Sequence, residues 1–170
     1  MRIAELKLND CVDGEGITVS LWMQGCPLKC KGCHNKCLWD FEGGYDEPEL
    51  KGKIIKAITA NGIKRNFSIL GGEPLCEENK DTVLEVLKSV RVVYPDIKIY
   101  LWTGYTYEFL KSQNDEVINE IFNYIDFLID GPYIEEERDL TLKLRGSRNQ
   151  RIIDMNTTKG TSKLSLVVEK

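Results

Sequence analysis

Three cysteines, Cys26, Cys30 and Cys33, stand at the spacing C-x3-C-x2-C within one short segment of this chain. Thiolates are soft ligands, and such a cluster in a chain without a secretory signal predicts a metal or iron–sulfur site rather than a disulfide. A single loop with this spacing can hold three iron corners of one 4Fe–4S cluster. The fourth iron then lacks a protein ligand and is open to a small molecule.

A fourth cysteine, Cys37, leaves two alternatives open. With Cys37 as a ligand the run reads C-x3-C-x2-C-x3-C, which also suits a structural zinc site or a fully ligated electron-transfer cluster. We expect Cys11, Cys37 and Cys76 not to be ligands, because cysteine often behaves as a small buried hydrophobic residue.

The composition excludes several classes of function. The chain has 170 residues, of which 42% are hydrophobic and 29% charged, as in an ordinary soluble domain. The net charge of −4 argues against a general nucleic-acid binder, and no apolar run is long enough to cross a membrane. We expect a single domain over residues 1–170, located in the cytoplasm. The one histidine, His34, leaves little room for a histidine-based triad.

The hydrophobic pattern predicts the elements that position the cysteine loop. Apolar and β-branched runs predict buried strands, and alternation predicts a weaker one near the start. Helical spacing predicts helices between the strands. The predicted strands are residues 2–8, 17–23, 66–70, 97–102 and 125–129, with possible final strands at 151–154 and 164–169. The predicted helices are residues 49–61, 81–93, 107–111 and 116–124.

Four of these strands run into a glycine and are separated by helices, which is the pattern of βαβ units and a parallel sheet. Eight strands do not fit into this length, so we expect an α/β fold in which five or six parallel strands form an open, partial barrel. Parallel strands bring their C-terminal ends to one edge, where such folds carry their sites. That edge would gather the cysteine loop, Gly72 with Glu73, Thr103 and Asp130.

The run Gly71-Gly72-Glu73-Pro74 at a strand end is the second chemical signal. Glycines let a ligand approach the backbone closely, and carbonyl oxygens together with a carboxylate can accept hydrogen bonds from an ammonium group. An ordinary strand-to-helix turn is the alternative. The cysteine loop one βα unit earlier favours the ligand-binding interpretation.

With both motifs the chain resembles the radical S-adenosylmethionine superfamily, and within it the activating proteins of glycyl-radical enzymes. The likeness is closest to activators of anaerobic ribonucleoside-triphosphate reductase. Activators of pyruvate formate-lyase or of another glycyl-radical enzyme are the alternative within this class. A non-catalytic iron–sulfur or zinc module is the alternative outside it. The resemblance is carried by residues 13–16, 20–26, 33–35, 39–41, 71–74, 102–105, 129–133 and 145–150.

The resemblance implies a partial barrel of the radical S-adenosylmethionine type in which Cys26, Cys30 and Cys33 ligate one 4Fe–4S cluster. A small donor such as flavodoxin would reduce the cluster, and the fourth iron would chelate S-adenosylmethionine. Reductive cleavage would give methionine and a 5′-deoxyadenosyl radical. That radical would take a hydrogen atom from a glycine on a loop of the reductase large subunit.

The same resemblance implies a set of residues around S-adenosylmethionine. The backbone of residues 32–34 would contact the adenine, and residues 71–73 would hold the methionyl ammonium group. Asp130 would reach the ribose or a loop of the partner, although a turn-forming Asx role explains it equally well. The set is Gly32, Cys33, His34, Gly71, Gly72, Glu73, Thr103 and Asp130.

Three further features have weaker interpretations. Arg145, Arg148 and Arg151 suit either carboxylates of the cofactor or partner, or a solvated basic turn. We expect Trp39 and Phe41 to pack over the cysteine loop. Gly32 departs from the superfamily, which favours an aromatic residue before the third cysteine.

Overall fold

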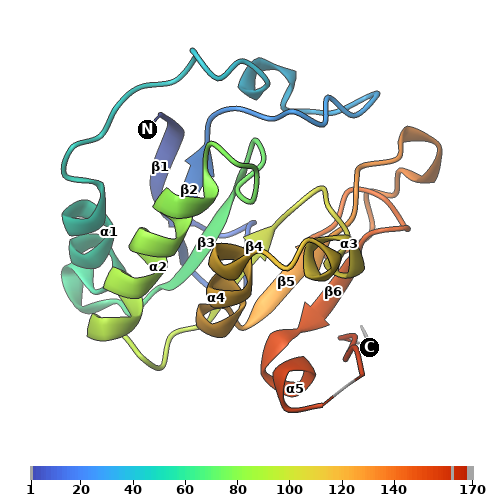
Figure 1. The fold of residues 1–170 in the computed structure, drawn as a ribbon. Helices are drawn as coiled ribbons and strands as arrows, with labels where there is room; N and C mark the ends of the chain where they lie inside the picture. The colour runs from blue at the N-terminus through green and yellow to red at the C-terminus, as the bar shows by residue number, and fades with distance from the viewer. Residues whose placement is uncertain (1, 162, 168–170) are drawn as a thin grey trace.

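The computed structural model describes residues 2–161 and 163–167, and it contains one six-stranded sheet with the order β1-β2-β3-β4-β5-β6 (Figure 1). β2 to β5 pair in parallel, and the edge strands β1 and β6 are antiparallel to their neighbours. The predicted α/β class is confirmed, and the sheet is open. The strands are β1 (Ile3–Asp10), β2 (Thr18–Met23), β3 (Asn66–Gly71), β4 (Ile99–Trp102), β5 (Phe127–Asp130) and β6 (Arg151–Asp154).

The prediction of five or six parallel strands is wrong at both edges of the sheet. Parallel neighbours need a crossover connection, usually a helix, whereas antiparallel neighbours can be joined by a loop. β1 and β2 are joined by residues 11–17 and β5 and β6 by residues 131–150, and the described residues show no α-helix in either connection. Only the four central strands are parallel.

The possible final strand at residues 164–169 is also wrong for the part that the structure describes. A single antiparallel bridge joins Leu166 to Ile153, and residues 168 and 169 lie outside the described residues. A helix that the hydrophobic pattern missed precedes this segment. It begins after Asp154, whose side chain accepts a hydrogen bond from the Thr157 N–H and caps the first turn.

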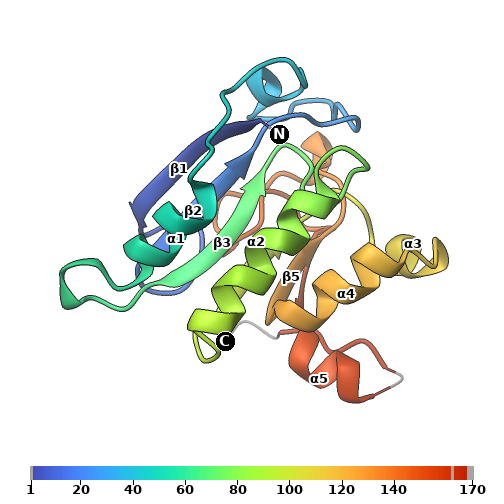
Figure 2. The ribbon, with the colours of Figure 1, turned by 60° about the vertical axis from the view of Figure 1, so that its left-hand side comes forward.

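The predicted helices are confirmed with ends shifted by a few residues. α1, α2 and α4 cover one face of the sheet (Figure 2). Parts of the two helix-free connections, near residues 12–15 and 142–144, lie on the opposite face. The helices are α1 (Leu50–Ile58), α2 (Lys80–Val93), α3 (Tyr107–Ser112), α4 (Glu116–Tyr124) and α5 (Met155–Gly160), with short 3₁₀ turns η1 (Lys36–Leu38), η2 (Ala60–Gly62) and η3 (Glu135–Glu137).

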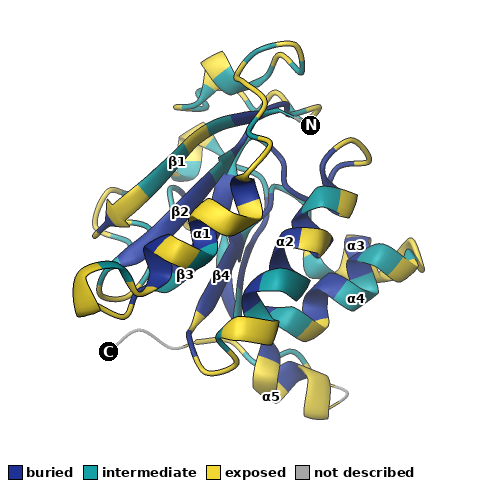
Figure 3. Ribbon diagram, turned by 90° about the vertical axis from the view of Figure 1, so that its left-hand side faces the viewer, coloured by how far each residue is buried: buried dark blue, intermediate teal, exposed yellow. Residues whose placement is uncertain are grey.

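The core lies between the sheet and these helices, and buried residues follow the central strands and the inner helix faces (Figure 3). On β2, Val19, Leu21 and Met23 join the main core. On the helix-free face, Tyr100, Ile129 and Ile152 form a smaller apolar cluster. Burial on both faces explains why β4 and β5 read as nearly continuous apolar runs, whereas β2 and β3 also bury Thr18, Ser20 and Ser68. Among the described residues, no helix is both long and apolar enough to span a membrane.

Candidate functional site

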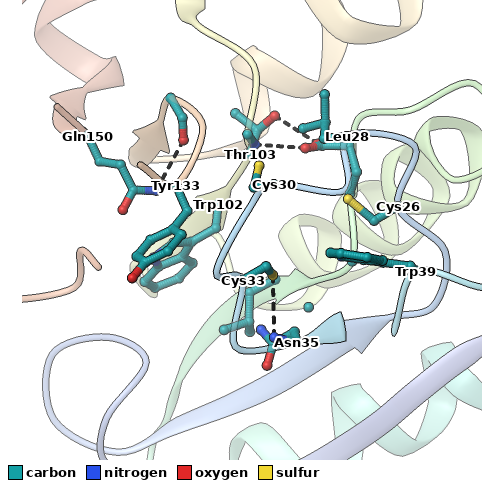
Figure 4. A pocket seen from close by; sticks show the side chains of 16 residues that line it. Cys26, Leu28, Cys30, Cys33, Asn35, Trp39, Trp102, Thr103, Tyr133 and Gln150 are labelled. Atoms are coloured by element: carbon teal, nitrogen blue, oxygen red, sulfur yellow. Dashed lines mark hydrogen bonds between the residues drawn. The ribbon is translucent and has the colours of Figure 1, made fainter. Parts of the chain in front are cut away.

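A cavity of about 170 Å³ lies at the C-terminal ends of β2 to β5, and it brings together most of the predicted site (Figure 4). The three predicted cysteine ligands line it, and so do Gly71, Gly72, Glu73 and Thr103. The convergence expected for a parallel sheet therefore occurs at this edge. The lining also contains residues for which no site role was predicted, namely Leu28, Asn35, Trp39, Leu70, Trp102, Gly104, Gly131, Tyr133 and Gln150.

The three cysteine thiols are half-buried and form no disulfide. The backbone N–H of Asn35 donates to Cys33 Sγ at 3.3 Å. Burial raises the pKa of the Cys26 thiol, while hydrogen bonds from the Leu28 and Lys29 N–H groups act in the opposite direction. Backbone N–H groups directed at sulfur stabilise thiolates and tune iron–sulfur clusters. The donor set therefore fits a cluster held by three thiolates.

Cys37 is exposed on η1 and is not part of the cavity lining. In the described part of the chain, no three His, Cys, Asp or Glu side chains are placed to hold a single metal ion. That Cys37 is not a ligand stays a prediction. The expectation that the other cysteines are buried is right for Cys76 and wrong for Cys11 and Cys37, which lie in exposed connections.

Close packing holds the cysteine loop against the strand ends. A Cβ atom on Gly25 would lie 2.1 Å from the Phe41 ring, and one on Gly72 would lie 2.2 Å from the Gly25 carbonyl oxygen. A Cβ atom on Gly104 would lie 2.3 Å from the Leu28 side chain. Glycine is therefore needed at Gly72, which meets backbone, and at Gly25, which has a φ of +90° beside the Phe41 ring, whereas Leu28 could move to make room at Gly104. Phe41 packs as predicted, whereas Trp39 lines the cavity.

Glu73 is a buried carboxylate bound by neutral donors. It accepts hydrogen bonds from the Thr103 hydroxyl at 2.8 Å, the Gly104 N–H at 2.7 Å and the Leu75 N–H at 2.9 Å. Burial raises the pKa of Glu73 to about 7, although these hydrogen bonds lower it. Across residues 2–161 and 163–167, no lysine, arginine or histidine forms an ion pair with it. The cavity thus contains an acidic group that a cationic ligand would stabilise.

Asp130 is also buried, but its charge is already compensated. Arg151 donates to both carboxylate oxygens, and the Tyr107 N–H at the start of α3 donates to one of them at 2.7 Å. Arg151 also pairs with Glu108 at 2.7 Å. Gly131 lines the cavity, whereas Asp130 does not. A contact between Asp130 and the cofactor stays a prediction.

Gly32 and His34 lie on the cysteine loop but outside the cavity lining. His34 is exposed, and its ring centroid lies 5.7 Å from that of Tyr133, which does line the cavity. Gly32 has a φ of +74°, and a Cβ atom there would lie 2.6 Å from the Glu135 side chain. An aromatic residue would not fit this position without movement of Glu135. The predicted adenine contact stays a prediction.

The segment at residues 145–150 folds back onto the end of β5. The Gln150 side-chain amide donates to the Gly131 carbonyl at 3.1 Å and accepts from the Gly146 N–H at 2.9 Å, which holds Gln150 at the cavity. Arg148 pairs with Asp139 at 3.0 Å on the surface. Arg148 and Arg151 thus bind carboxylates of this chain.

Most of the residues that sequence reasoning missed carried a signal. Trp102, Tyr133 and Gln150 lie in motifs that support the family resemblance, and so do Asn35 and Trp39. Membership of a motif did not reveal which side chains face the cavity. Leu28 carried no signal beyond its place between two cysteines.

Comparison with known proteins first defines a class. A family model described as "4Fe-4S single cluster domain" matches residues 12–153. Similar proteins include the anaerobic ribonucleoside-triphosphate reductase-activating proteins of Vibrio cholerae, with 39% identity over 145 residues, and of Pasteurella multocida, with 38% over 155 residues. These matches cover 84% and 89% of this chain and 91% and 96% of the relatives. The corresponding protein of Escherichia coli K12 is 32% identical over 143 residues, which cover 83% of this chain and 90% of the relative. The chain therefore belongs to the family of anaerobic ribonucleoside-triphosphate reductase-activating proteins.

Proposed function

We propose that this protein binds one 4Fe–4S cluster and S-adenosylmethionine, and uses them to generate a glycyl radical on an anaerobic ribonucleoside-triphosphate reductase. Under this proposal the protein is a radical S-adenosylmethionine oxidoreductase. The observation that carries the proposal is that three half-buried thiols and an uncompensated buried carboxylate line one cavity. An electron carrier has no use for the carboxylate, whereas an amino-acid ligand supplies the missing cation.

The residues present fit both groups. Cys26, Cys30 and Cys33 would hold three irons and leave one without a protein ligand. Glu73, with the backbone of Gly71 and Gly72, would accept hydrogen bonds from the methionyl ammonium. When bound, the reduced cluster supplies the electron that cleaves the sulfonium C–S bond of S-adenosylmethionine to methionine and the 5′-deoxyadenosyl radical, which abstracts a glycine hydrogen from the reductase.

The rest of the lining suits chemistry that must be kept from water. Trp39, Trp102 and Tyr133 contribute large aromatic surfaces to the cavity. Excluding water and fixing the reactants close together matters more here than proton transfer. His34 is outside the lining, and Glu73 is bound by three donors. The lining residues therefore serve to bind and orient the reactants, which suits transfer of a hydrogen atom.

We infer that the reductase approaches the helix-free face of the sheet. A second cavity, of about 620 Å³, lies on this face, and Tyr100, Phe127 and Ile152 contribute to its lining. It neighbours the first cavity where the Trp102 indole N–H donates to the Leu144 carbonyl oxygen at 2.7 Å. The open sheet is compatible with a partial barrel of the radical S-adenosylmethionine type. The electron donor in this proposal is a small reductant such as flavodoxin.

The test is anaerobic reconstitution with iron and sulfide, followed by dithionite, S-adenosylmethionine and the reductase. We expect 5′-deoxyadenosine and an electron paramagnetic resonance doublet on the reductase. Cys33→Ala should lose the cluster absorbance, and Cys37→Ala should keep it. A wild-type protein that holds a cluster and yields no 5′-deoxyadenosine would be a non-catalytic module. A doublet that appears only on pyruvate formate-lyase would assign the protein to that partner.

A further inference from the structure

The loops that follow β2 and β5 meet beside the cavity, although their strands are not neighbours in the sheet (Figure 1). Lys31 Nζ on the cysteine loop lies 3.0 Å from Glu136 Oε1 and 3.4 Å from Glu135 Oε2. Both glutamates belong to η3, five and six residues after the end of β5. The ion pairs therefore connect the loop after β2 to the loop after β5, both of which contribute residues to the cavity lining.

Two further contacts accompany the ion pairs. The Cα of Gly32 lies so close to Glu135 that a Cβ atom would collide with its side chain, and the rings of His34 and Tyr133 are in tilted contact. Cys33 stands between Gly32 and His34, and both Cys33 and Tyr133 line the cavity. Any separation of the two loops would therefore move residues that shape the site.

The contact is weak enough to open and close. The side chains of Lys31, Glu135 and Glu136 are 78%, 46% and 69% exposed. Exposed ion pairs contribute little to stability and are screened by salt. Except for the short 3₁₀ turns η1 and η3, both loops lack regular structure among the described residues, so the surrounding backbone offers little resistance to local opening.

We propose that Lys31, Glu135 and Glu136 form a strap that closes the cysteine loop against the loop after β5 and so positions the lining around S-adenosylmethionine. These are positioning residues, because they act through Cys33 and Tyr133 and not on the ligand. Opening of the strap lets the ligand enter and its products leave. The ligand named here rests on the proposed function, whereas the contact between the loops does not.

Charge reversal tests the strap without relying on activity. Hydrogen–deuterium exchange is followed in the full-length reconstituted protein for peptides covering residues 28–36 and 131–138, with α2 as the internal reference. We expect Lys31→Glu to speed exchange in both peptides by roughly threefold. The triple variant K31E/E135K/E136K should return to the wild-type rates. Lys36→Glu, an exposed lysine on the same loop with no ion pair among the described residues, is the charge-matched control.

The second readout separates binding from turnover. Lys31→Glu should raise the KM for S-adenosylmethionine roughly threefold with kcat kept, and the triple variant should restore it. Exchange in Lys31→Glu equal to that in Lys36→Glu, or no rescue in the triple variant, would overturn the strap. If wild-type protein forms no 5′-deoxyadenosine, the proposed function fails, but the exchange result still decides the strap.

Discussion

Glu73 and Asp130 are both buried carboxylates that come at or just after the end of a parallel strand, yet their surroundings differ in one respect. Asp130 is neutralised by Arg151, which donates to both of its oxygens. Glu73 receives hydrogen bonds from a hydroxyl and two backbone N–H groups, with no cation among the described residues. Burial accordingly raises the pKa of Glu73 to about 7.

The difference shows which of the two buried carboxylates already has its charge compensated within the protein. A buried charge with a well-placed ion partner gains little from a further ligand. A buried carboxylate with only neutral donors is costly to ionise, and a cationic ligand reduces that cost. We therefore assign cation binding to the β3 side, near the cysteines, and a structural role to the Asp130–Arg151 pair on the β5 side.

The largest expected effect follows removal of the Glu73 charge. Glu73→Gln should weaken S-adenosylmethionine binding about 100-fold, or about 3 kcal/mol, because a buried hydrogen-bonded charge pair is lost. Equilibrium binding to the reconstituted protein measures it. Glu77→Gln, which changes an exposed carboxylate four residues further on, is the matched control and should bind normally. Equal affinities in the two variants would end the distinction drawn between the two carboxylates.

On the other side of the site, Arg151→Met should act on stability and not on binding. It leaves the Asp130 carboxylate buried without its cation, so we expect the free energy of unfolding to fall by about 2 kcal/mol. Chemical denaturation measures this loss. Arg148→Met removes an exposed ion pair and should cost less than about 1 kcal/mol. A stable Arg151→Met protein that binds S-adenosylmethionine more tightly than the wild type would instead place the cation site at Asp130.

The smallest expected effect is a pH dependence of binding. The ammonium group binds the ionised form of Glu73, and the pKa of Glu73 in the free protein is about 7. Affinity should therefore rise about fivefold from about pH 6 to pH 7, a range in which an α-amino group stays protonated. Glu73→Gln should remove this slope. A slope that persists in the variant would belong to another group.

Local pattern was enough to predict the central strands and most helices, because their apolar spacing and glycine ends are features of the segments themselves. It was not enough to predict the direction of β1 and β6. Strand direction depends on the connection, and the helix-free connections before β2 and before β6 were the available clue.

The same distinction, between local pattern and contacts over a long sequence distance, applies to the site. The spacing of Cys26, Cys30 and Cys33 identified them directly, since one loop carries all three. The hydrogen bond from Thr103 to Glu73 joins residues 30 positions apart. The ion pair between Asp130 and Arg151 joins residues 21 positions apart. No spacing rule encodes such partners, so the sequence placed both carboxylates at the site without revealing that one was already paired.

The most direct test of cation binding by Glu73 uses the ligand's own charge. The affinity of the reconstituted wild-type protein for S-adenosylmethionine is compared with its affinity for the desamino analogue, which lacks the ammonium group. We predict a preference of about 100-fold for S-adenosylmethionine, and a much smaller preference in Glu73→Gln. Equal affinity of the wild-type protein for the two compounds would contradict the account.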